Sequence, residues 1–105
     1  MARRASVTQT GNGTSSTVAL DTYSPLTSLA IVVSGGPPNY TVQHTLDDVL
    51  NSAVTPTWFD HDTLVAQTTN QDGNYAYPVA GVRLVINSGG GVATLTILQA
   101  GGTVL

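Results

Sequence analysis

The sequence predicts an all-β protein: an antiparallel β-sandwich of jelly-roll-like form with about seven or eight short strands. Charged residues make up only 9% of the chain, and Lys and Glu are absent. Thr, Ser, Asn and Gln must therefore solvate the surface, and these residues favour strands and turns over helices. Apolar and polar residues alternate in short runs, and groups of Gly, Pro and Asn separate the runs at intervals of about 8–12 residues.

The N-terminal part of the chain predicts a hairpin followed by a turn. Gly11-Asn12-Gly13 lies between the Thr- and Val-rich segments Ser6–Thr10 and Thr14–Leu20. Asn-Gly adopts positive φ easily, so these three residues predict a hairpin turn between two strands. Thr22-Tyr23-Ser24-Pro25 predicts a turn or an edge segment, because Pro cannot donate to a central ladder.

The next two runs are the clearest strands. Thr27–Ser34 is apolar on both faces, which indicates a central strand or one covered by a partner. Gly35-Gly36-Pro37-Pro38-Asn39 then interrupts the chain. In Tyr40–Leu46, the residues Tyr40, Val42, His44 and Leu46 share one face, as in a half-buried antiparallel strand. His44 is accordingly expected to be packed or interfacial rather than catalytic.

The middle of the chain is less regular. Asp47–Ala53 either forms one helical turn capped by an Asp or remains a turn. Thr55-Pro56-Thr57 is expected to be extended, and Trp58-Phe59 follows as the one adjacent aromatic pair. Thr63–Thr68 is expected to form another short strand.

The C-terminal part predicts a loop and a closing hairpin. Thr69–Asn74 contains Asn, Asp and Gly and predicts a loop, followed by the extended segment Tyr75–Val79. Val82–Asn87 and Val92–Gln99 alternate cleanly, and Ser88-Gly89-Gly90-Gly91 between them predicts a hairpin tip.

Size and charge restrict the function. The 105 residues predict a single domain over 1–105, with residues 1–6 as an N-terminal arm and residues 101–105 as a C-terminal tail. The formal net charge of −3 argues against a nucleic-acid partner, which would require a basic face. No apolar run is long enough for a membrane span, and the chain has no Cys. We therefore expect neither nucleic acid nor a membrane as partner.

The candidate chemical groups do not form a recognisable site. Asp60-His61-Asp62 has too few ligands for calcium or zinc and is expected to be a polar turn. The neighbouring Asp47 and Asp48 would point to opposite faces of a strand, which does not suit paired carboxylate catalysis. Ser88–Gly91 lacks the Lys of a phosphate loop. We expect no enzyme activity, no catalytic residues, no metal and no cofactor.

Binding is the remaining role, and several residues are candidates for it. Trp58 and Phe59, together with Tyr75 and Tyr77, could either form a sugar platform or fill one end of the sandwich or an interface. Arg3 and Arg4 belong either to a solvated tail or to a short basic arm that docks on an acidic neighbour. In the second case Val104 and Leu105 would extend onto neighbouring subunits at the other terminus.

The chain also resembles the small virion structural proteins of tailed bacteriophages. The resemblance rests on Val42–Val49 (VQHTLDDV), Pro56–Phe59 (PTWF), Asp72–Tyr75 (DGNY) and Val82–Ile86 (VRLVI), followed by the Gly-rich segment. It covers residues 40 to 99. It implies a capsid decoration or cement protein with a jelly-roll-like fold, which sits on the capsid exterior and bridges capsid subunits.

That resemblance implies two partners, the major capsid protein and other copies of the chain in a dimer or trimer. It also implies a location in the virion after synthesis in the bacterial host cytoplasm. Two alternatives remain open, a glycan-binding module and a tail or collar structural protein.

Overall fold

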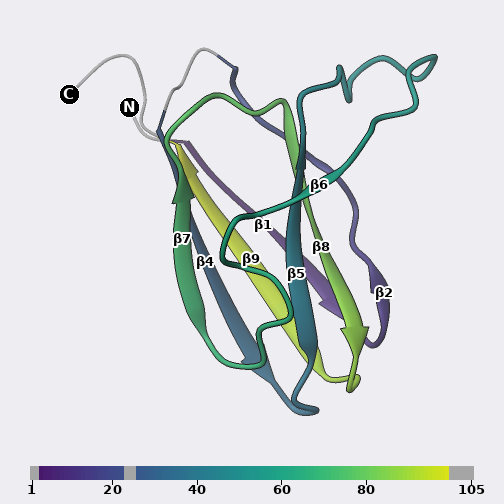
Figure 1. The fold of residues 1–105 in the computed structure, drawn as a ribbon, viewed down its shortest axis with the longest axis vertical. Helices are drawn as coiled ribbons and strands as arrows, with labels where there is room; N and C mark the ends of the chain where they lie inside the picture. The colour runs from purple at the N-terminus through teal and green to yellow at the C-terminus, as the bar shows by residue number, and fades with distance from the viewer. Residues whose placement is uncertain (1–2, 23–25, 100–105) are drawn as a thin grey trace.

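The computed structural model describes residues 3–22 and 26–99 and confirms the predicted β-sandwich. Over these residues it contains strands and no helix (Figure 1). Sheet A has the order β1 (Arg3–Thr10), β9 (Val92–Gln99), β4 (Thr27–Ser34), β7 (Gln71–Tyr75). Sheet B has the order β2 (Gly13–Thr14), β8 (Gly81–Ser88), β5 (Asn39–Thr45), β6 (Phe59–Asp60), and β3 (Val18–Ala19) also pairs with β8. All pairs are antiparallel.

The strand order is that of a jelly roll. The short strands β2 and β3 pair with opposite ends of β8 and together form one interrupted edge. If they are counted as one strand, every connection except that between β5 and β6 crosses from one sheet to the other. Sheet A then holds the first, eighth, third and sixth strands, and sheet B holds the remaining four.

The two predicted hairpins are wrong, because both turns cross between the sheets. β1 pairs with β9 and β8 pairs with β5, so neither Gly11–Gly13 nor Ser88–Gly91 joins hydrogen-bonded neighbours. The two turns instead contact each other: Gly11 N–H donates to the Gly91 carbonyl at 2.8 Å, and Gly90 N–H donates to Asn12 Oδ1 at 3.0 Å. Glycine permits positive φ in a crossing turn as readily as in a hairpin.

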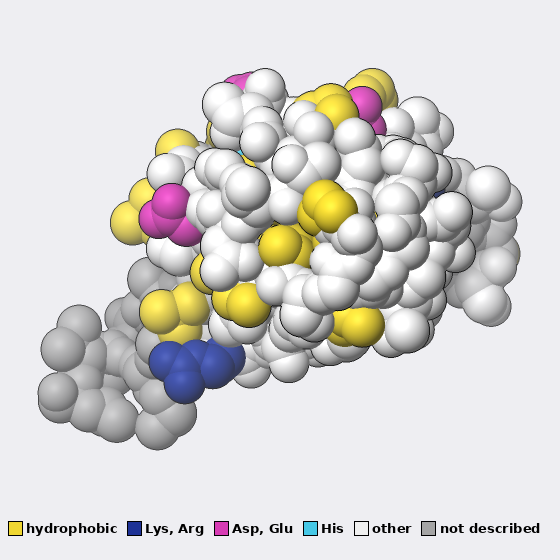
Figure 2. Space-filling model, turned by 90° about the horizontal axis from the view of Figure 1, so that it is seen from below, with side chains coloured by type: hydrophobic (Ala, Val, Ile, Leu, Met, Phe, Trp, Pro, Cys, Tyr) yellow, Lys and Arg dark blue, Asp and Glu magenta, His cyan; other side chains and the backbone are white. Residues whose placement is uncertain are grey.

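A third crossing turn, between β4 and β5, lies at the same end of the sandwich. There Gly89 approaches Pro37 so closely that a Cβ atom on Gly89 would overlap the Pro37 carbonyl oxygen. A Cβ on Gly91 would lie 2.8 Å from the Ser34 carbonyl oxygen. Figure 2 shows this end of the molecule, where uncharged polar groups and backbone cover most of the surface. The glycines thus allow three turns to pack against one another.

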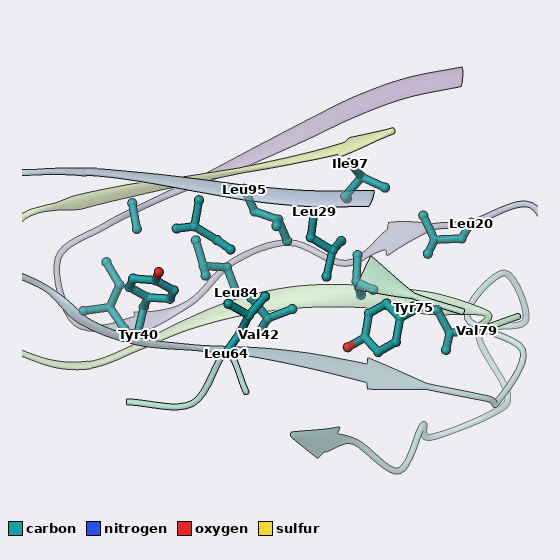
Figure 3. Packing of buried hydrophobic residues seen from close by; sticks show 14 residues of the cluster. Leu20, Leu29, Tyr40, Val42, Leu64, Tyr75, Val79, Leu84, Leu95 and Ile97 are labelled. Atoms are coloured by element: carbon teal, nitrogen blue, oxygen red, sulfur yellow. The ribbon is translucent and has the colours of Figure 1, made fainter. Parts of the chain in front are cut away.

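The core lies between the sheets and follows the predicted alternation (Figure 3). Leu29 of β4 faces Val42 of β5 and Leu84 of β8 across the interior, and Leu64 reaches in from a loop. The buried hydrophobic residues are Leu20, Leu29, Ile31, Tyr40, Val42, Leu64, Tyr75, Val79, Val82, Leu84, Ile86, Ala93, Leu95 and Ile97.

The segment predicted as a loop is partly the edge strand β7. Asp72 and Asn74 point outward from it and are exposed, which explains its polar composition. Gly73 faces inward, where Leu64 Cδ1 would lie 3.0 Å from an added Cβ. The expected strand Thr63–Thr68 is instead a loop that supplies Leu64 to this position. It bonds to β5 through the Tyr40–Gln67 bridge and through the Val42 N–H group, which donates to the Leu64 carbonyl at 2.9 Å.

The segment after β5 forms turns and not a helix. Leu50 N–H donates to Asp48 Oδ1 at 3.0 Å, and Thr57 N–H donates to Asp47 Oδ2 at 2.7 Å. These carboxylates bind backbone groups of an extended loop, as Asp side chains do in turns. The strand β5 ends at Thr45, so Leu46 leaves the inward face and is 65% exposed, contrary to the predicted alternation.

Candidate interaction surfaces

Four rings gather where the open edges of the two sheets meet, beside β6 and β7. This aromatic cluster consists of His44, Phe59, Tyr75 and Tyr77. His44 on β5 pairs with Phe59 on β6, and their ring centroids lie 6.0 Å apart. The Tyr75 and Tyr77 rings lie 4.9 Å and 6.4 Å from that of His44. Tyr75 is buried in the core, whereas Phe59 and Tyr77 are 55% and 47% exposed.

Burial shapes the electrostatics of this cluster. His44 Nδ1 lies 2.9 Å from the Tyr75 hydroxyl oxygen. Burial raises the pKa of the Tyr75 hydroxyl well above its usual value, so this group stays protonated. Burial, assisted by the nearby His61 ring, lowers the pKa of His44, and Asp62 and Asp60 partly oppose that shift. The cluster therefore favours neutral side chains.

Trp58 does not belong to the aromatic cluster. The Arg83 guanidinium carbon lies 4.2 Å from the centroid of the Trp58 ring, so this cation covers one face of the indole. Arg83 Nε–H also donates to Gln43 Oε1 at 2.8 Å, and Gln43 Nε2 donates to Asp60 Oδ1 at 2.9 Å. These residues form a polar row across β8, β5 and β6 that holds Trp58 in place.

His61 is a structural residue of the loop beneath the cluster. Its Nδ1 accepts from the Thr63 and Leu64 N–H groups, both at 3.1 Å, and its Nε2 lies 2.8 Å from the Asn74 carbonyl oxygen. Both ring nitrogens are thus occupied by backbone groups. The described parts of the chain hold no group of three or more potential metal ligands.

An apolar hollow opens beside the long loop after β5. It has a volume of about 310 Å³ and is lined by Ala19, Leu20, Thr22, Leu46, Asp48, Val49, Leu50 and Ala80. Leu50 on its rim is 83% exposed. The loop projects from the sandwich as the teal segment at the upper right of Figure 1. We use the name apolar end for four exposed hydrophobic residues: Leu46 and Leu50, which line this hollow, and Phe59 and Tyr77 of the aromatic cluster.

The two arginines predicted as an arm lie in a strand. Arg3 to Ser6 belong to β1 and pair with β9, which differs from the expected arm over residues 1–6. Arg3 donates to Gln99 Oε1 at 3.1 Å and to the Ala19 carbonyl at 3.0 Å, so it ties β1 to β9 and β3. Arg4 is exposed on the outer face of sheet A. Val104 and Leu105 lie outside the described residues, as do residues 1 and 2.

Phe59 and Trp58 remain predicted binding residues. Phe59 is 55% exposed, whereas the Arg83 guanidinium covers one face of the Trp58 ring. Sequence reasoning did not single out Leu46 and Leu50, because the first was assigned to an inward face and the second to the apolar side of a helix. Within residues 3–22 and 26–99, no helix is long and apolar enough to cross a membrane.

The sequence of this chain matches no family model and no curated protein. Among solved structures, the SPBc2 prophage-derived protein YomS has the same fold, with a TM-score of 0.60, 11% identity and 94% of each chain covered. A protein of Bacillus endospore appendages gives a TM-score of 0.49 at 16% identity, with 95% of this chain and 87% of that chain covered. A protein of the Helicobacter pylori bacteriophage KHP30 capsid gives a TM-score of 0.46 at 14% identity, with 99% of this chain and 90% of that chain covered. At these identities the similarity to YomS concerns the fold of the chain.

Proposed function

We propose that this chain is a structural protein of a phage virion that binds the outside of the capsid and bridges capsid subunits, as a decoration or cement protein. The observation that carries the proposal is the apolar end, four hydrophobic side chains that are 47% to 83% exposed, in a chain of which only 9% of the residues are charged. The shared fold with a prophage-derived protein and the sequence resemblance to small virion proteins support the same conclusion.

The apolar end is suited to protein contact. Leu50 and Phe59 are both mostly exposed, and the hollow beside Leu50 is large enough to receive a side chain of a neighbouring protein. Burial of one such exposed side chain contributes about 1.5–3 kcal/mol. A contact of this size is weak by itself, but a decoration protein that bridges subunits in many copies gains avidity from the rigid lattice.

The test is binding to empty phage heads that lack the protein. Leu50→Asp and Phe59→Ala should each reduce the number of copies bound per head, because both remove apolar surface without touching the core. Val65→Asp is the matched control, since Val65 is a partly exposed residue of another loop. Full occupancy by both apolar-end variants would contradict the proposal. Binding in about a dozen copies instead of hundreds would place the protein in the tail or collar.

A glycan-binding module is the second candidate, and the exposed rings of Phe59 and Tyr77 favour it. Aromatic faces next to acidic groups such as Asp60 are able to stack on sugars. Because Arg83 covers Trp58, the informative variants are Phe59→Ala and Tyr77→Ala. Loss of glycan-array binding in both, with head decoration unchanged in Leu50→Asp, would favour this alternative over the capsid role.

A further inference from the structure

The edge strand β1 has a free backbone edge eight residues long. Among the described residues it pairs only with β9. Gly11 N–H donates to the Gly91 carbonyl, and this pair continues the register that places Gln9 opposite Ala93. Because hydrogen-bonded and non-hydrogen-bonded pairs alternate along an antiparallel ladder, Arg3, Ala5, Val7 and Gln9 direct their backbone groups toward β9. The N–H and C=O groups of Arg4, Ser6, Thr8 and Thr10 therefore point away from the sheet.

The other sheet edges in the described part of the chain are protected. β6 has only two residues, and the edge formed by β2 and β3 is interrupted. On β7, the Asn74 carbonyl is already bound by His61 Nε2. β1, by contrast, contains no Pro and pairs in continuous register, and Arg4, Ser6, Thr8 and Thr10 are all exposed. A long regular edge of this kind is a template for another strand.

We propose that two copies of this chain pair antiparallel through β1, around a two-fold axis that passes beside Val7. In this register Arg4 lies opposite Thr10 of the second copy, and Ser6 lies opposite Thr8 of the second copy. Each copy then donates four N–H groups to its partner and accepts at four carbonyls. The Thr10 carbonyl also accepts from Gln9 Nε2 at 3.3 Å, and its second lone pair stays available.

The sequence of β1 selects a second copy of itself as the occupant. The register centred on Val7 is the one that uses all four outward residues, since a shift in either direction leaves at least one of them unpaired. It also places Arg4 opposite a neutral Thr, so that no like charges face each other. The result joins sheet A of both copies into one continuous sheet with an isologous contact. This inference does not depend on capsid binding, because it concerns the isolated protein.

Cysteine cross-linking tests the register directly. The chain contains no Cys, so Val7→Cys introduces one thiol per copy, and two such residues facing across the axis are within disulfide range. We expect rapid formation of a covalent dimer on oxidation. Val32→Cys is the control: Val32 is 58% exposed in the centre of sheet A and should cross-link far more slowly. Failure of Val7→Cys to cross-link, or equal rates for both variants, overturns the proposal.

Two further variants test the pairing by charge. Ser6→Lys with Thr8→Asp places opposite charges across the axis twice, whereas Ser6→Lys with Thr8→Lys places like charges there. Sedimentation of the native protein should show a dimer. The Lys–Asp variant should remain dimeric, and the dimer of the Lys–Lys variant should weaken about tenfold or more. A native protein that stays monomeric at high micromolar concentration, or equal affinity in the two variants, contradicts the model. Far-UV circular dichroism verifies that each variant is folded.

Discussion

His44 Nδ1 lies 2.9 Å from the hydroxyl oxygen of Tyr75, and this contact links β5 of sheet B to β7 of sheet A. Tyr75 is buried, whereas His44 stands at the boundary between the core and the exposed rings of Phe59 and Tyr77. The pair thus closes the core on the side of the sandwich where β6, with two residues, is too short to cover it. The same pair gives the fold a pH dependence.

We predict that the protein loses stability as the pH falls below about 6.5, the usual pKa of His. Burial lowers the pKa of His44 in the folded state, so the unfolded chain binds the proton more readily. The stabilising effect of neutral His44 is complete above the unfolded-state pKa and decreases as the pH falls toward the folded-state value. Urea unfolding at pH 7.5 and 5.5 measures the change. His44→Gln should show a smaller difference between these two pH values, and an undiminished difference would argue against His44 as the source.

Leu64→Ala should lower the free energy of unfolding by about 2–4 kcal/mol, because it leaves a cavity in the core. Leu64 comes from a loop, yet it is almost completely buried and lies against Gly73 of β7. The neighbouring Val65→Ala is the control and should change stability by about 0.5 kcal/mol or less. Chemical denaturation compares the two, and similar losses would mean that the loop does not complete the core.

Gly89→Ala should be far more destabilising than Gly90→Ala. Both glycines have positive φ, at 86° and 64°, so each substitution costs about 1–2 kcal/mol of backbone strain. A Cβ at Gly89 also overlaps the Pro37 carbonyl oxygen, whereas a Cβ at Gly90 meets nothing within 4 Å. Thermal unfolding should show a clearly lower Tm for Gly89→Ala. Equal Tm values would contradict the close contact of the crossing turns.

Arg83→Ala should shift the fluorescence of Trp58 to longer wavelength. The chain has a single Trp, and the Arg83 guanidinium covers one face of its ring. Removal of the guanidinium admits water to the indole and removes a contact that stabilises by about 0.5–2 kcal/mol. Arg4→Ala removes an equally charged residue far from the ring and should leave the emission unchanged. An unchanged spectrum in both variants would show that Arg83 does not cover the ring in solution.

Local patterns predicted some strands closely and others not at all. The β4 bounds coincide with the predicted Thr27–Ser34, and the inward residues of β8 and β9 follow the predicted alternation. The strand β7 was not predicted, because its outward residues are polar and its inward residue Gly73 has no side chain. Leu64, from another part of the chain, fills the space beside Gly73. Nothing local to β7 indicates burial.

In the candidate surfaces too, local sequence patterns predicted some features and missed those that depend on distant residues. Phe59 and Trp58 are adjacent in the sequence, but only the structure shows that Phe59 is exposed and that Arg83, distant in sequence, stacks on Trp58. Leu46 and Leu50 acquire their exposure from the point at which β5 ends, and that point depends on the turn hydrogen bonds of Asp47 and Asp48. The alternating pattern continues through Leu46 and gives no sign of the change.

By itself, the sequence determined the fold class, because a two-residue period and a nearly uncharged, Thr-rich composition favour strands over helices wherever they occur along the chain. Only the tertiary structure decided which strands are neighbours. A turn such as Gly11–Gly13 has the same residue requirements whether it leads to the adjacent strand or to the opposite sheet. The choice depends on packing between distant faces: β1 and β4 both pair with β9, and their inward side chains become buried only when sheet B covers them.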